Sequence, residues 1–252
     1  MEAAVDSEPI ATAKPSLPMN DDDALDAYLQ RHYIGAEQLA RACSIAADEL
    51  HSLVDEGLAP QASYRVSTAG VLVSQAFGEF QAPGVTPGDY FHPGHAHWVL
   101  LASDLKHQAG AQRASEALRQ CFKRNFIAAL AEFDRTIFRL PDSFTDAGQA
   151  IPDGLDARAM NAWRAFIKGV YGLCVADPSS ERSIARKEVL QEALGQLSGR
   201  VSEPSLHAED KQRLRALITE YAEVCMPFSP LEYPRSSRKR LVEDLSARLD
   251  AA

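Results

Sequence analysis

One long helical pattern, between residues 114 and 137, limits the fold more than any other feature of the chain. Its apolar side chains recur every three or four positions, which places them on one face of an α-helix. Several Arg and Lys residues occupy the other faces. We therefore expect an amphipathic helix of about seven turns at the centre of a helical fold. The apolar stripe consists of Ala114, Leu118, Phe122, Phe126, Leu130, Phe133 and Ile137.

Shorter helical patterns follow this stripe after a loop rich in Pro, Asp and Gly. Ser179 or Ser180 can cap a helix with Glu181 in its first turn, where the helix dipole favours an acid. Pro234 suits the first turn of a last helix. The patterns predict helices over residues 163–174, 180–197, 206–224 and 234–249. Together they predict a helical bundle of about five helices over residues 91–252.

The first ninety residues differ in character. Residues 1–22 are rich in Pro, Ala, Ser and Asp and lack periodicity, so we predict a disordered leader. Three short helices should follow, one from Asp23, one over residues 34–42 and one over residues 46–56. The β-branched and aromatic residues between 63 and 81 predict a short β-hairpin, and Pro and Gly predict an irregular loop over residues 82–94. We therefore predict a mainly α fold. Its parts are a leader over residues 1–22, a module of short helices and a hairpin over residues 23–90, and a helical domain over residues 91–252.

The segment YIGAEQLARACSIAADELHSLVDEGLAPQASYRV, residues 33–66, resembles the helix-turn-helix of the MerR-like winged regulators. In such folds the second helix enters the major groove with polar or basic side chains. Here that helix carries Asp48, Glu49, Asp55 and Glu56 and no Lys or Arg. Residues 21–60 contain nine acidic and two basic residues. The resulting negative charge of this segment repels DNA. We interpret the segment as a helix-turn-helix-like module for packing, dimerisation or partner binding.

The charge and cysteine content point to a cytoplasmic protein. The net charge is −9, whereas a general nucleic-acid binder needs a surplus of bases. No apolar run approaches the roughly 18 residues of a membrane-spanning helix, and acids stand where a secretory signal carries bases. The four cysteines are widely spaced without a CxxC pair, which fits reduced thiols. We expect no membrane partner and no nucleic acid, and we consider a homodimer.

The densest group of reactive side chains lies in DYFHPGHAHW. Imidazole and carboxylate groups this close together can bind Zn, Fe, Mn or Ni. In the other interpretation His92 hydrogen-bonds within the loop, while His95 and His97 lie in the first turn of a helix. Because alternate residues on a helix point about 200° apart, these two rings share one ion only if the backbone is extended there. The candidate metal ligands are Asp89, His92, His95 and His97.

Two basic groups could hold an anion. Arg182 and Arg186 are four residues apart on one helix face, a spacing that can clamp a carboxylate or phosphate, although a solvated face explains them equally well. Arg235, Arg238, Lys239 and Arg240 gather at a predicted helix start. Cations there oppose the helix dipole, so an anionic partner, outside the chain or within its acidic N-terminal module, should compensate for them.

Four segments together resemble a poorly characterised bacterial family labelled natural-product biosynthesis proteins. These are LDAYLQRHYIGAEQLARACSI, YFHPGHAHW, GVYGLCV followed by IARKE, and PFSPLEYPRSSRKRLV. The resemblance runs from about residue 23 to the end of the chain and implies a place in secondary metabolism without a known reaction. If the family shares an active site, we expect it in these segments, because aromatics beside Arg, Lys, His and Glu suit an amino-acid-sized polar substrate.

Our leading hypothesis is a tailoring or accessory enzyme that acts on a small amino-acid-derived or carrier-bound substrate, with a divalent metal as the cofactor considered. His92 would be the general base or a metal ligand, with Tyr90 beside it. The predicted substrate-binding residues are Trp98, Tyr171, Arg182, Arg186, Lys187 and Arg238. Two alternatives remain. One is a non-catalytic protein that docks on a synthetase or carrier protein, and the other is a winged-helix regulator with a ligand-sensing helical domain.

Overall fold

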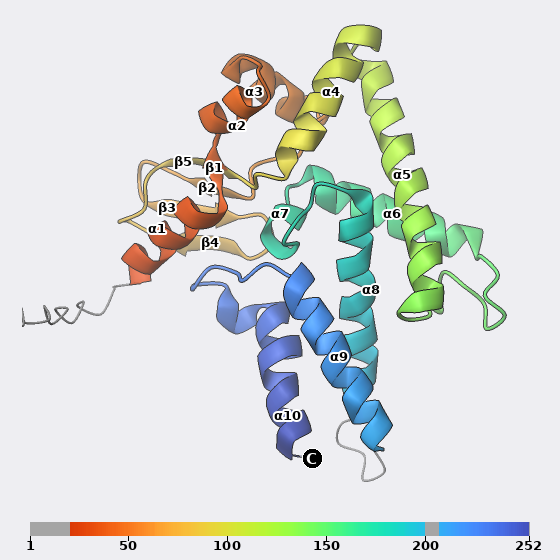
Figure 1. Ribbon diagram of the computed structural model, residues 1–252. Coiled ribbons are helices and arrows are strands. Elements are labelled where there is room, and N and C mark those ends of the chain that lie inside the picture. The colour runs from red at the N-terminus through yellow and green to blue at the C-terminus, as the bar shows by residue number, and fades with distance from the viewer. Residues whose placement is uncertain (1–20, 200–206, 252) are drawn as a thin grey trace, which may run out of the picture.

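The computed structural model describes residues 21–199 and 207–251, and these form a mostly helical protein with a small antiparallel sheet (Figure 1). The longer helices are α1 (Asp21–His32), α4 (His95–Ala109), α5 (Ala111–Thr136), α6 (Pro152–Ile167), α8 (Glu181–Leu197) and α9 (Ala208–Val224). The shorter ones are α2 (Ala36–Ala42), α3 (Ala47–Asp55), α7 (Tyr171–Cys174) and α10 (Leu245–Ala251). The strands are β1 (Ile34–Gly35), β2 (Tyr64–Val66), β3 (Val71–Ser74), β4 (Gly78–Gln81) and β5 (Gly88–Phe91).

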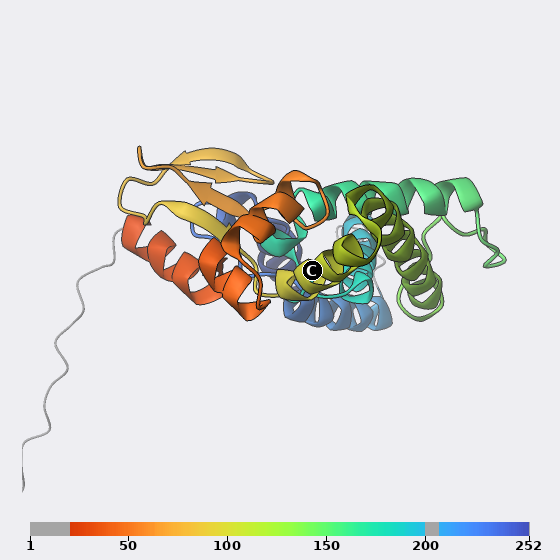
Figure 2. The same ribbon diagram turned by 90° about the horizontal axis from the view of Figure 1, so that it is seen from above.

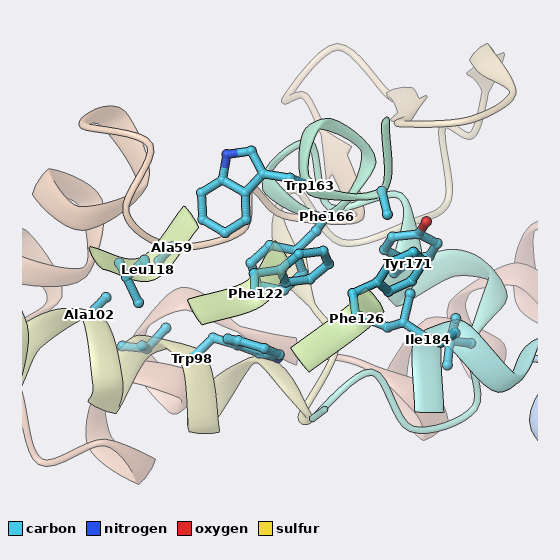
Figure 3. Close-up of a cluster of buried hydrophobic side chains, with 14 of the residues drawn as sticks. Ala59, Trp98, Ala102, Leu118, Phe122, Phe126, Trp163, Phe166, Tyr171 and Ile184 are labelled. Carbon is cyan, nitrogen blue, oxygen red and sulfur yellow. The ribbon is translucent and has the colours of Figure 1, made fainter. Parts of the chain in front are cut away.

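The α5 stripe is the centre of the main hydrophobic core, as its spacing predicts. Leu118, Phe122 and Phe126 are buried, and α4, α6 and α8 surround the helix. Figure 3 shows Phe122 beside Trp98, Trp163 and Phe166. The ring centroid of Phe122 lies 5.1 Å from that of Phe166 and 5.4 Å from that of Trp163, a separation at which aromatic rings attract each other.

The sheet has the strand order β1-β5-β2-β3-β4, with every neighbouring pair antiparallel. Residues 63–81 supply three strands rather than a simple hairpin. The prediction of an irregular loop over residues 82–94 is wrong in part, because β5 lies inside it. Tyr90 of β5 pairs with Tyr64 on one side and Gly35 on the other. Those partners are distant in the sequence, so local Pro and Gly content did not reveal the strand.

The predicted leader falls mostly outside the described residues, since 1–20 are not among them. Helix α1 begins at Asp21, two residues before the start expected from the sequence. Residue 90 is the predicted boundary between the N-terminal module and the helical domain. Buried hydrophobic side chains from both sides of it belong to the same two clusters. Figure 2 shows the sheet and α1 on one side of the molecule, and α5 and α6 on the other.

The acidic helix α3 packs against α4 through polar contacts. Ser103 donates a hydrogen bond to Glu49 at 2.6 Å, and Lys106 Nζ lies 2.8 Å from both Ser52 and Glu56. Two of the four acids that distinguish this helix are therefore engaged by the next helix of the same chain.

The single helix expected over residues 163–174 is wrong, because the chain breaks between α6 and α7. Gly169 has φ 73°, and a Cβ there would lie 2.3 Å from the carbonyl oxygen of Gln61. Only glycine adopts this backbone conformation without strain, and only glycine allows so close an approach. A contact with a residue more than 100 positions away thus ends the helix.

In the C-terminal third, α8 and α9 agree with the predicted helices, whereas the last helix does not. Ser180 caps α8 by accepting a hydrogen bond from the Ser183 amide at 3.2 Å. Helix α9 begins at Ala208, and Leu206 lies outside the described residues. A single last helix from Pro234 is wrong: Pro234 belongs to a 3-10 helix over Tyr233–Arg235. The chain is extended at Ser236, whose hydroxyl accepts from the Lys239 amide at 3.0 Å. Ser236 thus caps a helix that begins at Ser237, is π-helical over Lys239–Asp244 and continues as α10.

Nowhere in residues 21–199 and 207–251 does a helix combine the length and the apolar character needed to cross a membrane.

We predict that Gly169→Ala destabilises the protein strongly. The left-handed conformation alone costs a non-glycine residue about 1–3 kcal/mol, and the clash with Gln61 must also be relieved. The free energy of unfolding should therefore fall by about 2–4 kcal/mol in urea titrations. Gly195→Ala is the matched control, because Gly195 lies inside α8 and an added Cβ would meet no atom within 4 Å; it should stabilise by up to about 1 kcal/mol. Equal effects of the two substitutions would contradict this explanation.

Candidate functional site

His92 and His95 lie side by side, with ring centroids 6.1 Å apart. His92 follows β5 and its Nδ1 accepts a hydrogen bond from the Gly94 amide at 3.0 Å. His95 is in the first turn of α4 and is 1% exposed. Burial lowers the pKa of His92 to about 4. Burial, and then the neighbouring His92, lower the pKa of His95 to about 3, so both imidazoles are neutral at neutral pH.

The structure does not bring the other two predicted metal ligands to this pair. Asp89 lies on β5 and forms an ion pair with Arg65 at 2.9 Å. His97 is exposed and its ring lies against Trp98. Among the residues described, no three His, Cys, Asp or Glu side chains are grouped so that they could hold a metal ion.

Tyr90 and Trp98 also lie apart from one another. Tyr90 donates a hydrogen bond to the Thr86 carbonyl at 2.8 Å and borders a surface groove between α1, α2 and the sheet. Trp98 belongs to the α5 core, where its indole N–H donates to the Pro178 carbonyl at 2.8 Å. The two residues are near His92 in the chain, but the structure assigns them to different surroundings.

The two arginines of α8 already have carboxylate partners within the chain. Arg182 forms two hydrogen bonds with Glu132, at 2.5 and 3.2 Å, and its guanidinium lies 4.8 Å from the Phe133 ring centre. Arg186 pairs with Glu220 at 2.9 Å. Because the two partners differ, the arginines do not face a common anion.

Part of the basic group near residue 238 has partners within the chain. Arg238 donates to the carbonyls of Ala222 and Cys225, at 2.7 and 2.8 Å, and so satisfies acceptors at the C-terminal end of α9. Lys239 forms ion pairs with Glu243 and Asp244. The anionic partner of Lys239 is therefore local, whereas Arg235 lies over the rings of Phe77 and Phe80.

Two of the predicted binding residues, Tyr171 and Lys187, do meet in one cavity. It has a volume of about 360 Å³ and lies between α5, α6, α7 and α8. Apolar side chains from α5, α6 and α8 line much of it, and Figure 3 shows Phe126 and Tyr171 next to each other. The lining residues are Phe126, Leu130, Arg158, Asn161, Ala162, Ala165, Val170, Tyr171, Cys174, Lys187, Glu188 and Val189.

Lys187 is the most deeply buried charged group at the wall of this cavity. Its side chain is 4% exposed, and Nζ lies 3.3 Å from Oε1 of Glu188, which is 35% exposed. Burial disfavours the ammonium, but the Glu188 carboxylate favours it, as does Cys174 where its thiol is ionised, and the pKa of Lys187 lies well above its ordinary value. Burial raises the pKa of Cys174 to about 11 and that of Tyr171 well above its usual range. At neutral pH the wall therefore presents an ammonium, a thiol and a phenol.

Sequence reasoning missed Asn161 as a member of this site. Cys174 and Glu188 lie in the segments GVYGLCV and IARKE, where the resemblance favours an active site, but neither is among the predicted binding residues. Glu188 had a usable signal, since it directly follows Lys187, but nothing local relates Asn161 on α6 to either residue.

A model of DUF6058, described as a family of unknown function, matches residues 118–250, slightly more than half of the chain. The chain belongs to the DUF6058 family. All of the residues that line the cavity fall within the part matched by DUF6058, whereas His92 and His95 precede it. Neither the curated proteins nor the solved structures include a match to this DUF6058 chain.

We predict that the two buried histidines make the protein acid-sensitive. Their folded-state pKa values lie below the ordinary 6.5, so the unfolded chain takes up protons that the folded chain does not as the pH falls. The stability is present above about pH 6.5 and is lost toward pH 4. Between pH 7 and 5 the two groups together should remove about 3–4 kcal/mol of unfolding free energy, measured in urea. His92→Gln should halve this loss, and the exposed His97→Gln should not change it.

We also predict that Cys174 is a poor nucleophile although it lines the cavity. With a pKa of about 11, roughly 0.03% of the thiol is ionised at pH 7.5. In a timed iodoacetamide reaction followed by mass spectrometry, Cys121 should be labelled before Cys174, because so little of the Cys174 thiol is ionised. Labelling of Cys174 as fast as that of Cys121 would mean that the cavity activates the thiol.

Proposed function

We propose that this DUF6058 protein binds a small molecule with an anionic group in the cavity between α5 and α8, as a tailoring or accessory protein of natural-product biosynthesis. The observation that carries the proposal is the nearly buried ammonium of Lys187 at the wall of a 360 Å³ cavity. The natural-product context rests on the resemblance of the sequence segments alone.

An ammonium has three N–H donors, and a buried charge is stable only when acceptors surround it. The carboxylate of Glu188 lies at 3.3 Å, toward the long end of hydrogen-bond distances. An anionic group that enters the cavity can therefore form shorter, charge-assisted hydrogen bonds with Lys187.

The chemistry of the wall supports binding more than covalent catalysis. Cys174 and Tyr171 are both protonated at neutral pH, and Lys187 is protonated too. None of them is prepared to act as a nucleophile or as a general base. The catalytic form of the proposal, with His92 as base or metal ligand, has less support, because His92 does not line this cavity.

A second candidate, a regulator with a ligand-sensing helical domain, is favoured by the position of α7. The α7 segment lies between the sheet and α8 (Figure 1). Tyr33 donates to the Gly172 carbonyl at 2.9 Å and Ser63 donates to the Gly169 carbonyl at 3.1 Å, while Tyr171 and Cys174 line the cavity. A ligand that moves α7 would thus act on the helix-turn-helix-like module. The docking alternative has less support, since Lys239, one of the four basic residues that motivate it, already pairs with Glu243 and Asp244.

The proposal predicts that small carboxylates stabilise the wild-type protein and not Lys187→Met. A ligand at 100 times its Kd adds about 2.7 kcal/mol, which raises Tm by about 5–10 °C in a chain of this size. A panel of aliphatic and aromatic carboxylates in differential scanning fluorimetry checks this. Arg182→Met is the control, because Arg182 lies on the same helix outside the cavity, and it should respond like wild type. The proposal fails if no compound with a carboxylate, amino acids included, stabilises the wild type, or if Lys187→Met responds equally.

A further inference from the structure

The geometry points to a free α-amino acid with an apolar side chain as the ligand of this cavity. We infer that its carboxylate binds Lys187, its ammonium binds Glu188 and its side chain lies on the apolar wall. This inference rests on the proposed function and names the ligand class.

Two opposite charges stand next to each other at the wall. Nζ of Lys187 and Oε1 of Glu188 are 3.3 Å apart. In an α-amino acid a single carbon separates the ammonium from the carboxylate, so its charges are spaced closely enough to meet both residues at once. Because Lys187 is nearly buried and Glu188 is more exposed, the carboxylate enters first and the ammonium lies nearer the opening.

The net charge of the wall favours a zwitterion over a simple anion. Lys187 and Glu188 sum to zero, and a monocarboxylate bound at Lys187 would place a second negative charge beside Glu188. Like charges at such separations cost binding free energy. Arg158 does not offset this charge, because it already pairs with Asp142 at 2.7 Å and with Glu192 at 2.7 Å.

The remainder of the cavity suits one apolar side chain. Phe126, Leu130 and Val189 are buried and line it together with Ala162. A volume of about 360 Å³ is at the small end of ligand pockets, which fits a single amino acid better than a peptide or a carrier arm.

Isothermal titration of the full-length protein with two matched series tests the inference. The first series is L-leucine, 4-methylpentanoate and 3-methylbutylamine, and the second is L-phenylalanine, 3-phenylpropanoate and 2-phenylethylamine. Within each series the side chain is constant and the ammonium or the carboxylate is missing. At least one amino acid should bind about tenfold or more tightly than either of its analogues, as expected when one charged hydrogen bond is lost.

Glu188→Gln provides the decisive comparison, because the amide keeps the size of the side chain and a hydrogen-bond acceptor beside Lys187 but removes the charge that would bind the ammonium. This substitution should weaken the amino acid by about tenfold or more and leave the matched carboxylate unchanged or bound more tightly. Glu220→Gln is the control, since Glu220 pairs with Arg186 outside the cavity; it should change neither.

The inference and the proposed function fail in different ways. If a carboxylate binds as tightly as its amino acid and Glu188→Gln affects both equally, the amino-acid assignment is overturned and the anion site stands. The same holds if neither amino acid binds but other carboxylates of the fluorimetry panel do. If nothing in either series or in that panel binds, the proposed function itself is wrong.

Discussion

Burial of one face of α5 is the interaction on which the rest of the structure depends. The stripe from Ala114 to Phe133 gathers α4, α6 and α8 around a single helix. Its middle part, around Phe122, is filled by large aromatic rings, whereas Phe126 and Leu130 border an open volume. The same helical face therefore provides both the densest packing and the floor of the cavity. A substitution in the stripe is expected to act on stability and on binding together.

Several conspicuous surface bases of this protein have acceptors at short range. Arg182, Arg186, Arg238 and Lys239 each have acceptors close in space, so these four side chains contribute to the structure. The groups whose protonation departs most from ordinary behaviour are internal. Burial keeps two histidines neutral, while Lys187 remains charged because acidic groups adjoin it.

Patterns of local origin were predictable from the sequence. The α5 stripe, the Ser180 cap and the helices that follow each express a periodicity or a terminal preference within a few residues. The strand β5 and the break at Gly169 were not predictable, because each depends on a partner from a remote segment. The same distinction holds for the candidate site.

Tyr171 and Lys187 could be selected by residue type, and Glu188 directly follows Lys187. Their grouping with Asn161 depends on how the helices pack together.

The contact between α7 and the sheet has a consequence for where this protein can be divided. The part matched by the family begins at residue 118, inside α5 and after the whole of the sheet and α4. A fragment that starts there would lose Tyr33 and Ser63, the hydroxyl donors that hold Gly172 and Gly169, and would expose the face of α5 that α4 covers. The part of the chain that the family matches is therefore shorter than the part whose contacts hold α5 and α7 in place.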